Sequence, residues 1–91
     1  MSMTLKEMKN YLRVDGTEDD TLIRNLIYSA ERLCLDVLRA DSTKVLYDSK
    51  YGRAAVMYAV NYMYEHRTEA DYRALTLSLR AMLFGSRKEA F

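Results

Sequence analysis

The sequence contains no proline and no tryptophan, and it has only three glycines, one cysteine and one histidine. Proline and glycine are the residues that most often interrupt helices, so their scarcity allows most of the chain to be helical. A single cysteine cannot form an internal disulfide framework, which removes the usual sign of an oxidising compartment. The formal net charge is only +1 at pH 7, and this balance argues against a dedicated nucleic-acid-binding protein with a strongly basic face.

Long apolar runs are also missing. No stretch approaches the roughly 18 apolar residues that a membrane-spanning helix requires, and the charged N-terminal segment does not resemble a signal peptide. We therefore expect a protein made in a cytoplasm, with no membrane partner. Apolar residues still make up 49% of the 91 residues, and their periodic spacing predicts a folded domain. A domain this short buries a modest core, so partners can add much of its stability.

The first predicted helix follows Thr4, which can form a capping box with Glu7. We expect the segment Val14–Thr17 to end it, since it contains the turn signal Asp15–Gly16 and glycine can take a positive φ without strain. Its apolar face consists of Leu5, Met8, Tyr11 and Leu12.

The second predicted helix is long and runs from about Glu18 to about Arg39, with Thr17 and Asp20 as a second capping box. Acidic residues in its first turn suit the helix dipole. Its apolar residues recur with a period of 3.6 and form one stripe. The stripe consists of Leu22, Ile23, Leu26, Ile27, Ala30, Leu33, Cys34, Val37 and Leu38.

A linker over residues 40–47 follows, and its second half, residues 44–47, is compatible with either an extended or a helical segment. The third predicted helix begins near Asp48 or Ser49 and runs to about His66. It is apolar over most of its circumference, as a buried helix is. A domain this small is not expected to surround it fully, so we expect part of its surface to meet another subunit. Its apolar residues are Ala55, Val56, Tyr58, Ala59, Val60, Tyr62 and Met63.

The fourth predicted helix covers roughly Tyr72 to Phe84, with Gly85 as its C-cap. Its apolar face consists of Leu75, Leu79, Met82 and Leu83. The predicted fold class is all-α, a small bundle of about four helices with one long helix and a central apolar helix. The expected organisation is one helical domain over residues 1–85 and a flexible C-terminal tail over residues 86–91.

Residues that carry chemistry are few. His66 has no second histidine or cysteine beside it in the sequence, whereas a zinc site needs several such ligands. Cys34 lies within an apolar stripe and has no evident base, so it is interpreted as a small buried hydrophobe. The scattered acidic residues form no acid–base pair, and no phosphate-binding loop is present. We therefore expect no enzyme, no cofactor and no metal.

Five of the eight tyrosines cluster in and before the third predicted helix, and three roles are open to them. They fit the core with their hydroxyls at the surface, a protein interface, or base stacking, in that order of preference. Few basic residues interleave with them, which is why base stacking comes last. The five are Tyr47, Tyr51, Tyr58, Tyr62 and Tyr64.

Tyr28 and Leu35 are predicted to lie on the side of the second helix opposite its apolar stripe. They sit among charged residues that include Arg32, and a pair of apolar residues inside a charged rim is typical of a small subunit contact. The hypothesis for the subunit interface is therefore Arg24, Tyr28, Glu31, Leu35 and Arg39. The tail offers a second hypothesis, because Arg87, Lys88 and the terminal Phe91 can form a flexible docking arm for a partner; a frayed terminus explains them equally well.

Two segments carry a resemblance to a known family. They are the opening Thr4–Asp15, which reads TLKEMKNYLRVD, and Tyr64–Arg67, which reads YEHR. With the Met82–Leu83 pair near the end of the last helix, their order resembles the head–tail connector family of long-tailed bacteriophages, which is also associated with DNA packaging. The family commonly has a proline before the last helix and an asparagine at the position of His66. The missing proline leaves the path between the last two helices open.

The resemblance implies a structural, portal-binding adaptor, a homo-oligomeric ring that is dodecameric in the virion. The ring would dock beneath the portal protein after DNA packaging and offer a platform for the next connector, stopper or tail protein. Double-stranded DNA would pass through its channel without sequence-specific contacts. Assembly would take place in the host cytoplasm. The alternative function is a small helical DNA-binding regulator; its helix-turn-helix has a turn of about 3–4 residues, shorter than the linker here.

Overall fold

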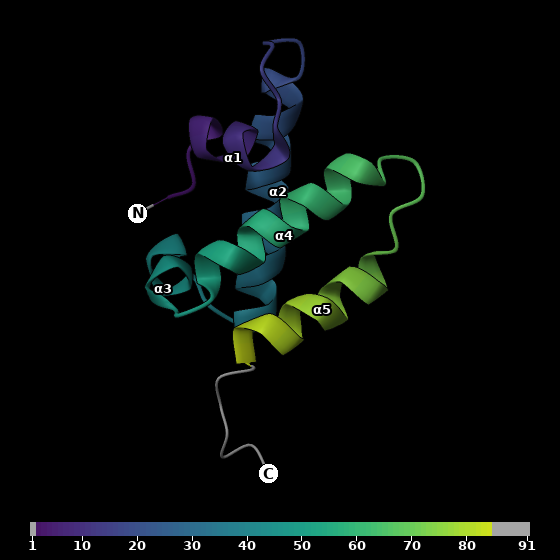
Figure 1. Ribbon diagram of the computed structural model, residues 1–91. Helices are drawn as coiled ribbons and strands as arrows, with labels where there is room; N and C mark the ends of the chain where they lie inside the picture. The colour runs from purple at the N-terminus through teal and green to yellow at the C-terminus, as the bar shows by residue number, and fades with distance from the viewer. Residues whose placement is uncertain (1, 85–91) are drawn as a thin grey trace.

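The computed structural model describes residues 2–84, and five α-helices make up its regular structure. They are α1 (Leu5–Leu12), α2 (Asp20–Leu38), α3 (Thr43–Asp48), α4 (Gly52–Glu65) and α5 (Tyr72–Phe84). The long helix α2 and the helix α4 cross each other, with α1 and α3 on one side of the crossing and α5 on the other (Figure 1). The predicted all-α bundle with one long helix is confirmed, and α3 adds a fifth helix to the four expected.

The first helix has the predicted start and ends directly before the predicted segment Val14–Thr17, but its C-cap is Arg13. Thr4 Oγ1 accepts a hydrogen bond from the backbone N–H of Glu7 at 3.1 Å, and the backbone N–H of Thr4 donates to Glu7 Oε1 at 3.0 Å. The positive φ expected at Gly16 lies instead at Arg13, with φ 63°. The reason is that the last carbonyls of α1 need donors directly at the helix end, and Arg13 and Val14 supply them there.

The start of α2 also differs from the expectation. The helix begins at Asp20 rather than Glu18, Asp19 is its N-cap residue, and no side chain makes a capping hydrogen bond. Tertiary contacts occupy the two carboxylates instead. Asp20 pairs with Lys9 of α1 at 2.8 Å, and Asp19 accepts the Tyr64 hydroxyl at 2.7 Å. The second capping box was therefore a wrong prediction.

The segment that sequence left open between extended and helical is helical. Ser42 Oγ accepts the backbone N–H of Lys44 at 3.1 Å and so caps α3. Asp48 and Ser49 were expected to start the next helix, but they form the last residue and the C-cap of α3. Helix α4 therefore starts later, at Gly52. A methyl group on Gly52 would overlap the backbone carbonyl of Leu46, so α3 and α4 meet at this glycine without a side chain between them.

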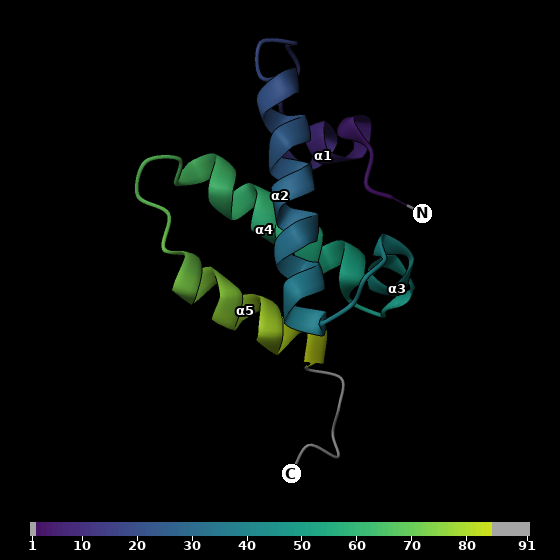
Figure 2. The same cartoon turned by 180° about the vertical axis from the view of Figure 1, so that it is seen from behind.

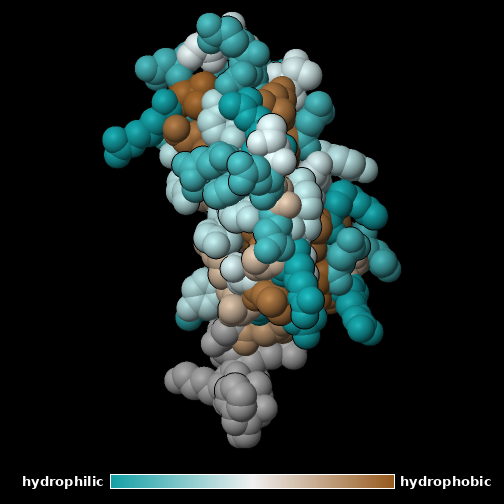
Figure 3. Space-filling view, turned by 90° about the vertical axis from the view of Figure 1, so that its right-hand side faces the viewer, coloured by the Kyte–Doolittle hydropathy of each residue, from teal (hydrophilic) through white to brown (hydrophobic). Residues whose placement is uncertain are grey.

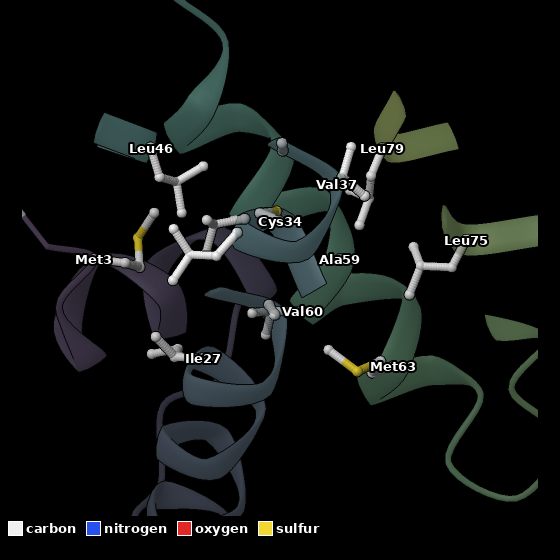
Figure 4. Close-up of a cluster of buried hydrophobic side chains, with 14 of the residues drawn as sticks. Met3, Ile27, Cys34, Val37, Leu46, Ala59, Val60, Met63, Leu75 and Leu79 are labelled. Carbon is white, nitrogen blue, oxygen red and sulfur yellow. The ribbon is translucent and has the colours of Figure 1, made fainter. Parts of the chain in front are cut away.

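One hydrophobic core lies between α2, α4 and α5, and Figure 4 shows part of it. Helix α4 packs against each of the other four helices. These helices cover more of the surface of α4 than the sequence led us to expect. Among the described residues, its exposed edge is limited to a line through Ala54, Tyr58 and Glu65. The expectation that this domain leaves a large part of α4 uncovered is therefore wrong, and α4 gives no reason to expect a second subunit. The fully buried side chains larger than alanine are Met8, Ile23, Cys34, Leu46, Val56, Val60, Leu75 and Leu79, of which Leu75 is 1% exposed.

The connection from α4 to α5 is fixed by Tyr62 rather than by a proline. The hydroxyl of Tyr62 accepts the backbone N–H of Asp71 at 3.0 Å, and the ring of His66 stacks on the Tyr62 ring with centroids 4.3 Å apart. Asp71 Oδ1 in turn accepts the N–H of Ala74 at 3.0 Å, which caps α5. The predicted bounds of this helix are confirmed. The predicted C-cap Gly85 and the predicted tail 86–91 lie outside the described residues.

Candidate assembly surfaces

The outward side of α2 is a basic surface of the described chain. Figure 2 shows α2 in front, with α4 crossing behind it. We call Arg24, Tyr28, Arg32 and Arg39 the outer face of α2; all four are exposed, and Tyr28 retains 65% of its accessible surface. Among the described residues, no carboxylate forms an ion pair with these three arginines, and Asp36 is the one exposed acidic side chain beside them.

Leu35 does not belong to this face, and this corrects the interface hypothesis. The side chain is only 5% exposed and belongs to the core. On an isolated helix Leu35 lies close to Tyr28, but α3 packs along one edge of that side, where Leu35 is buried while Arg32 and Arg39 stay exposed. The contact between Tyr47 of α3 and Glu31, one helical turn before Leu35, shows where α3 lies. The expected apolar pair is therefore a single exposed tyrosine.

Glu31 serves the fold of its own subunit. Its carboxylate accepts the hydroxyl of Tyr47 at 2.5 Å, and the guanidinium of Arg53 lies 5.4 Å from the centre of the Tyr47 ring. Burial and the hydrogen bond to the Glu31 carboxylate raise the pKa of Tyr47, so this hydroxyl stays protonated and keeps donating. Glu31 is thus a link between α2 and α3 and not a free rim residue for a neighbouring subunit.

A surface of opposite charge lies at the end of the molecule where α2 begins and α4 ends. The Tyr64–Asp19 hydrogen bond brings the loop before α2 and the loop after α4 together. The basic side chain Arg67 lies over the Tyr64 ring at 5.0 Å. We call the exposed carboxylates of these two loops and of the last residue of α4 the acidic end; they are Asp15, Glu18, Glu65, Glu69 and Asp71.

Helix α5 carries an exposed side that the sequence analysis did not single out. Leu77 is 59% exposed, and Ala74 and Ala81 lie beside it at i−3 and i+4. Arg73 and Arg80 are exposed on the same helix, which has no acidic residue. A search for a second apolar periodicity in this helix would have found it. The space-filling view shows small apolar patches separated by hydrophilic side chains (Figure 3). Contacts through such a surface depend on charge as well as on burial.

The clustered tyrosines divide between the core and the surface. Tyr47, Tyr62 and Tyr64 pack against the core with their hydroxyls hydrogen-bonded, as the preferred interpretation expected. Tyr51 and Tyr58 are each 38% exposed. An interface role for these two remains a prediction.

The described residues contain few groups that could act in catalysis or bind a metal ion. Cys34 is fully buried, and burial raises the pKa of its thiol to about 12, so the group is protonated at neutral pH and is a poor nucleophile. No group of three histidine, cysteine or acidic residues within 2–84 is placed to hold a metal ion. A surface pocket beside α1 has Lys6, Lys9 and Asp15 as its charged lining, without a nucleophile or a pair of carboxylates.

Within residues 2–84, no helix is both long enough and apolar enough to cross a membrane. A comparison with protein families finds that the model of the phage gp6-like head-tail connector proteins matches residues 2–89. The chain belongs to this family. Neither the curated proteins nor the solved structures gave a match.

Proposed function

We propose that the protein is the repeating subunit of a connector ring at the head–tail junction of a phage virion. Twelve copies would form the ring, dock under the portal protein after DNA packaging, and provide the platform for the next connector, stopper or tail protein. The observation that carries this proposal is the family match over nearly the whole chain. The small bundle with exposed charged and aromatic faces supports it, because such a surface suits contacts with other subunits.

The role of DNA in this proposal is passive. Double-stranded DNA passes through the channel and makes contacts that do not depend on its sequence, and the protein performs no chemistry on it. Tight binding of one duplex sequence at physiological salt, with a Kd of order 10⁻⁹ M, would instead indicate the regulator. The structure gives the regulator little support, since α3 separates α2 from α4 and α4 is packed against all other helices.

Deletion of the gene from the encoding phage tests the proposal. The expected result is heads filled with DNA beside unattached tails, with infectious particles reduced by several orders of magnitude. A plasmid copy of the wild-type gene should restore joining. Electron microscopy of the lysate separates the alternatives: heads without DNA would place the protein in packaging, and normal tailed particles would contradict the proposal.

The C-terminal tail is proposed to attach the ring to the portal. Arg87, Lys88 and Phe91, which lie outside the described residues, combine charge with a terminal aromatic anchor. One such arm binds weakly, but twelve arms on one ring bind together and gain by multivalency. Removal of residues 86–91 should therefore leave the melting temperature nearly unchanged and strongly reduce attachment to filled heads. Normal tail joining by the truncated protein would show that the tail is dispensable.

A further inference from the structure

Two surfaces of the described chain carry mainly opposite charges, with Asp36 beside the arginines of one and Arg67 beside the carboxylates of the other. The outer face of α2 presents Arg24, Arg32 and Arg39 around Tyr28, and none of the three guanidiniums has an ion-pair partner within residues 2–84. The acidic end presents carboxylates of the loops before α2 and after α4, with Arg67 placed over the Tyr64 ring. One subunit therefore carries two surfaces of opposite sign, and these surfaces do not neutralise each other internally.

We propose that the outer face of α2 docks onto the acidic end of a second copy of this chain, which rests on the ring proposed above. Tyr28 supplies the apolar contact, and the arginines around it meet the carboxylates of the neighbour. A tyrosine within arginines is the side-chain combination that protein interfaces favour most. Charge complementarity identifies the occupant, because the acidic end is the described surface of opposite sign.

The same charges determine the symmetry of the contact. A twofold dimer through the outer face of α2 would place arginine against arginine, and one through the acidic end would place carboxylate against carboxylate. Like charges facing each other across an interface are strongly unfavourable. A head-to-tail contact joins opposite signs at every interface, and such contacts close into a ring when the rotation per subunit allows it.

Charge reversal in two separate variants tests this arrangement. The first variant is Arg24→Glu with Arg32→Glu. The second replaces three of the five carboxylates of the acidic end, as Glu18→Arg, Glu65→Arg and Glu69→Arg, which makes that surface net positive. Each alone would place like charges at every interface, so each should reduce tailed particles by at least about tenfold when it complements the deletion phage. Together they can alternate around the ring, which restores opposite signs at each contact. Co-expression should therefore restore joining, and a twelve-membered ring is even-numbered and can close with two alternating variants.

A control variant reverses charges away from the proposed contact. Lys44→Glu with Asp48→Lys reverses the exposed ion pair within α3, whose atoms are 2.7 Å apart, and should join tails like the wild type. Far-UV circular dichroism and melting curves must show that both reversal variants fold, as expected for exposed positions. Glutamine at the positions of the two reversal variants gives a second pair of variants that only remove charge. These variants should also reduce the number of tailed particles, but by a smaller factor.

The outcomes separate the two proposals. If either reversal variant joins tails as well as the wild type, or if co-expression fails to restore what each variant loses, the head-to-tail contact assigned here is wrong. Both results leave the ring function intact, because the wild-type plasmid still rescues the deletion. A deletion phage that makes tailed particles without any copy of the protein contradicts the proposed function itself.

Discussion

Gly52→Ala is expected to lower the free energy of unfolding by about 3 kcal/mol, although alanine is normally the better helix residue. Alanine gains up to about 1 kcal/mol over glycine inside a helix. At Gly52, however, the added methyl group would overlap the backbone carbonyl of Leu46, and a backbone carbonyl cannot rotate away as a side chain can. The clash is relieved only if α3 moves off α4, which opens the core around the fully buried Leu46.

The matched control for Gly52→Ala is the same substitution at Gly16. There the methyl group would approach only the flexible, exposed side chain of Glu18, and the backbone φ is not positive. Gly16→Ala should therefore change stability by less than about 1 kcal/mol, in the stabilising direction. Urea unfolding followed by circular dichroism measures both, and Gly52→Ala should lower Tm by roughly 10–20 °C in a domain of this size. Equal stability of the two variants would contradict the close packing of α3 on α4.

The sequence predicts the helices of this fold well because their signals are local. The Thr4–Glu7 capping box and the apolar face of α5 depend on residues within one or two turns, and both are present as expected. The errors lie where a distant residue competes for the same group. Asp20 forms an ion pair with Lys9 instead of capping α2. Asp19 accepts a hydrogen bond from Tyr64, which lies 45 positions later in the chain. No local pattern reveals such a competitor.

The candidate surfaces were predictable only in part, for the same reason. A helical wheel correctly places Tyr28, Arg24 and Arg39 on the outward side of α2. It cannot show that α3 packs along one edge of that side and that Leu35 is buried there, because the sequence left residues 44–47 open between two conformations. The acidic end was equally hidden, since its carboxylates belong to two loops far apart in the chain. The packing of α2 on α4 and the Tyr64–Asp19 hydrogen bond bring these loops together.

Leu35→Asp is expected to destabilise the protein by about 4–5 kcal/mol, which is a large share of the roughly 5–15 kcal/mol that stabilises a typical domain. The side chain lies in the core at 5% exposure, between α2 and the helix α3 that covers it. An aspartate there has no cation to pair with among the core residues, so its charge is buried without compensation. The same position also loses the packing of a leucine, which Leu35→Ala should show separately at about 2–4 kcal/mol.

Tyr28→Asp introduces the same charge into the same helix, two turns earlier, where the side chain is 65% exposed. It should change the free energy of unfolding by less than about 1 kcal/mol, because water continues to solvate the carboxylate. Denaturant unfolding of the three variants should therefore rank Tyr28→Asp above Leu35→Ala and Leu35→Asp last, with Leu35→Asp losing much of its helical signal near physiological temperature. If Leu35→Asp kept the stability of Tyr28→Asp, α3 would not cover this side of α2. The two apolar residues would then form the exposed pair that the helical wheel suggests.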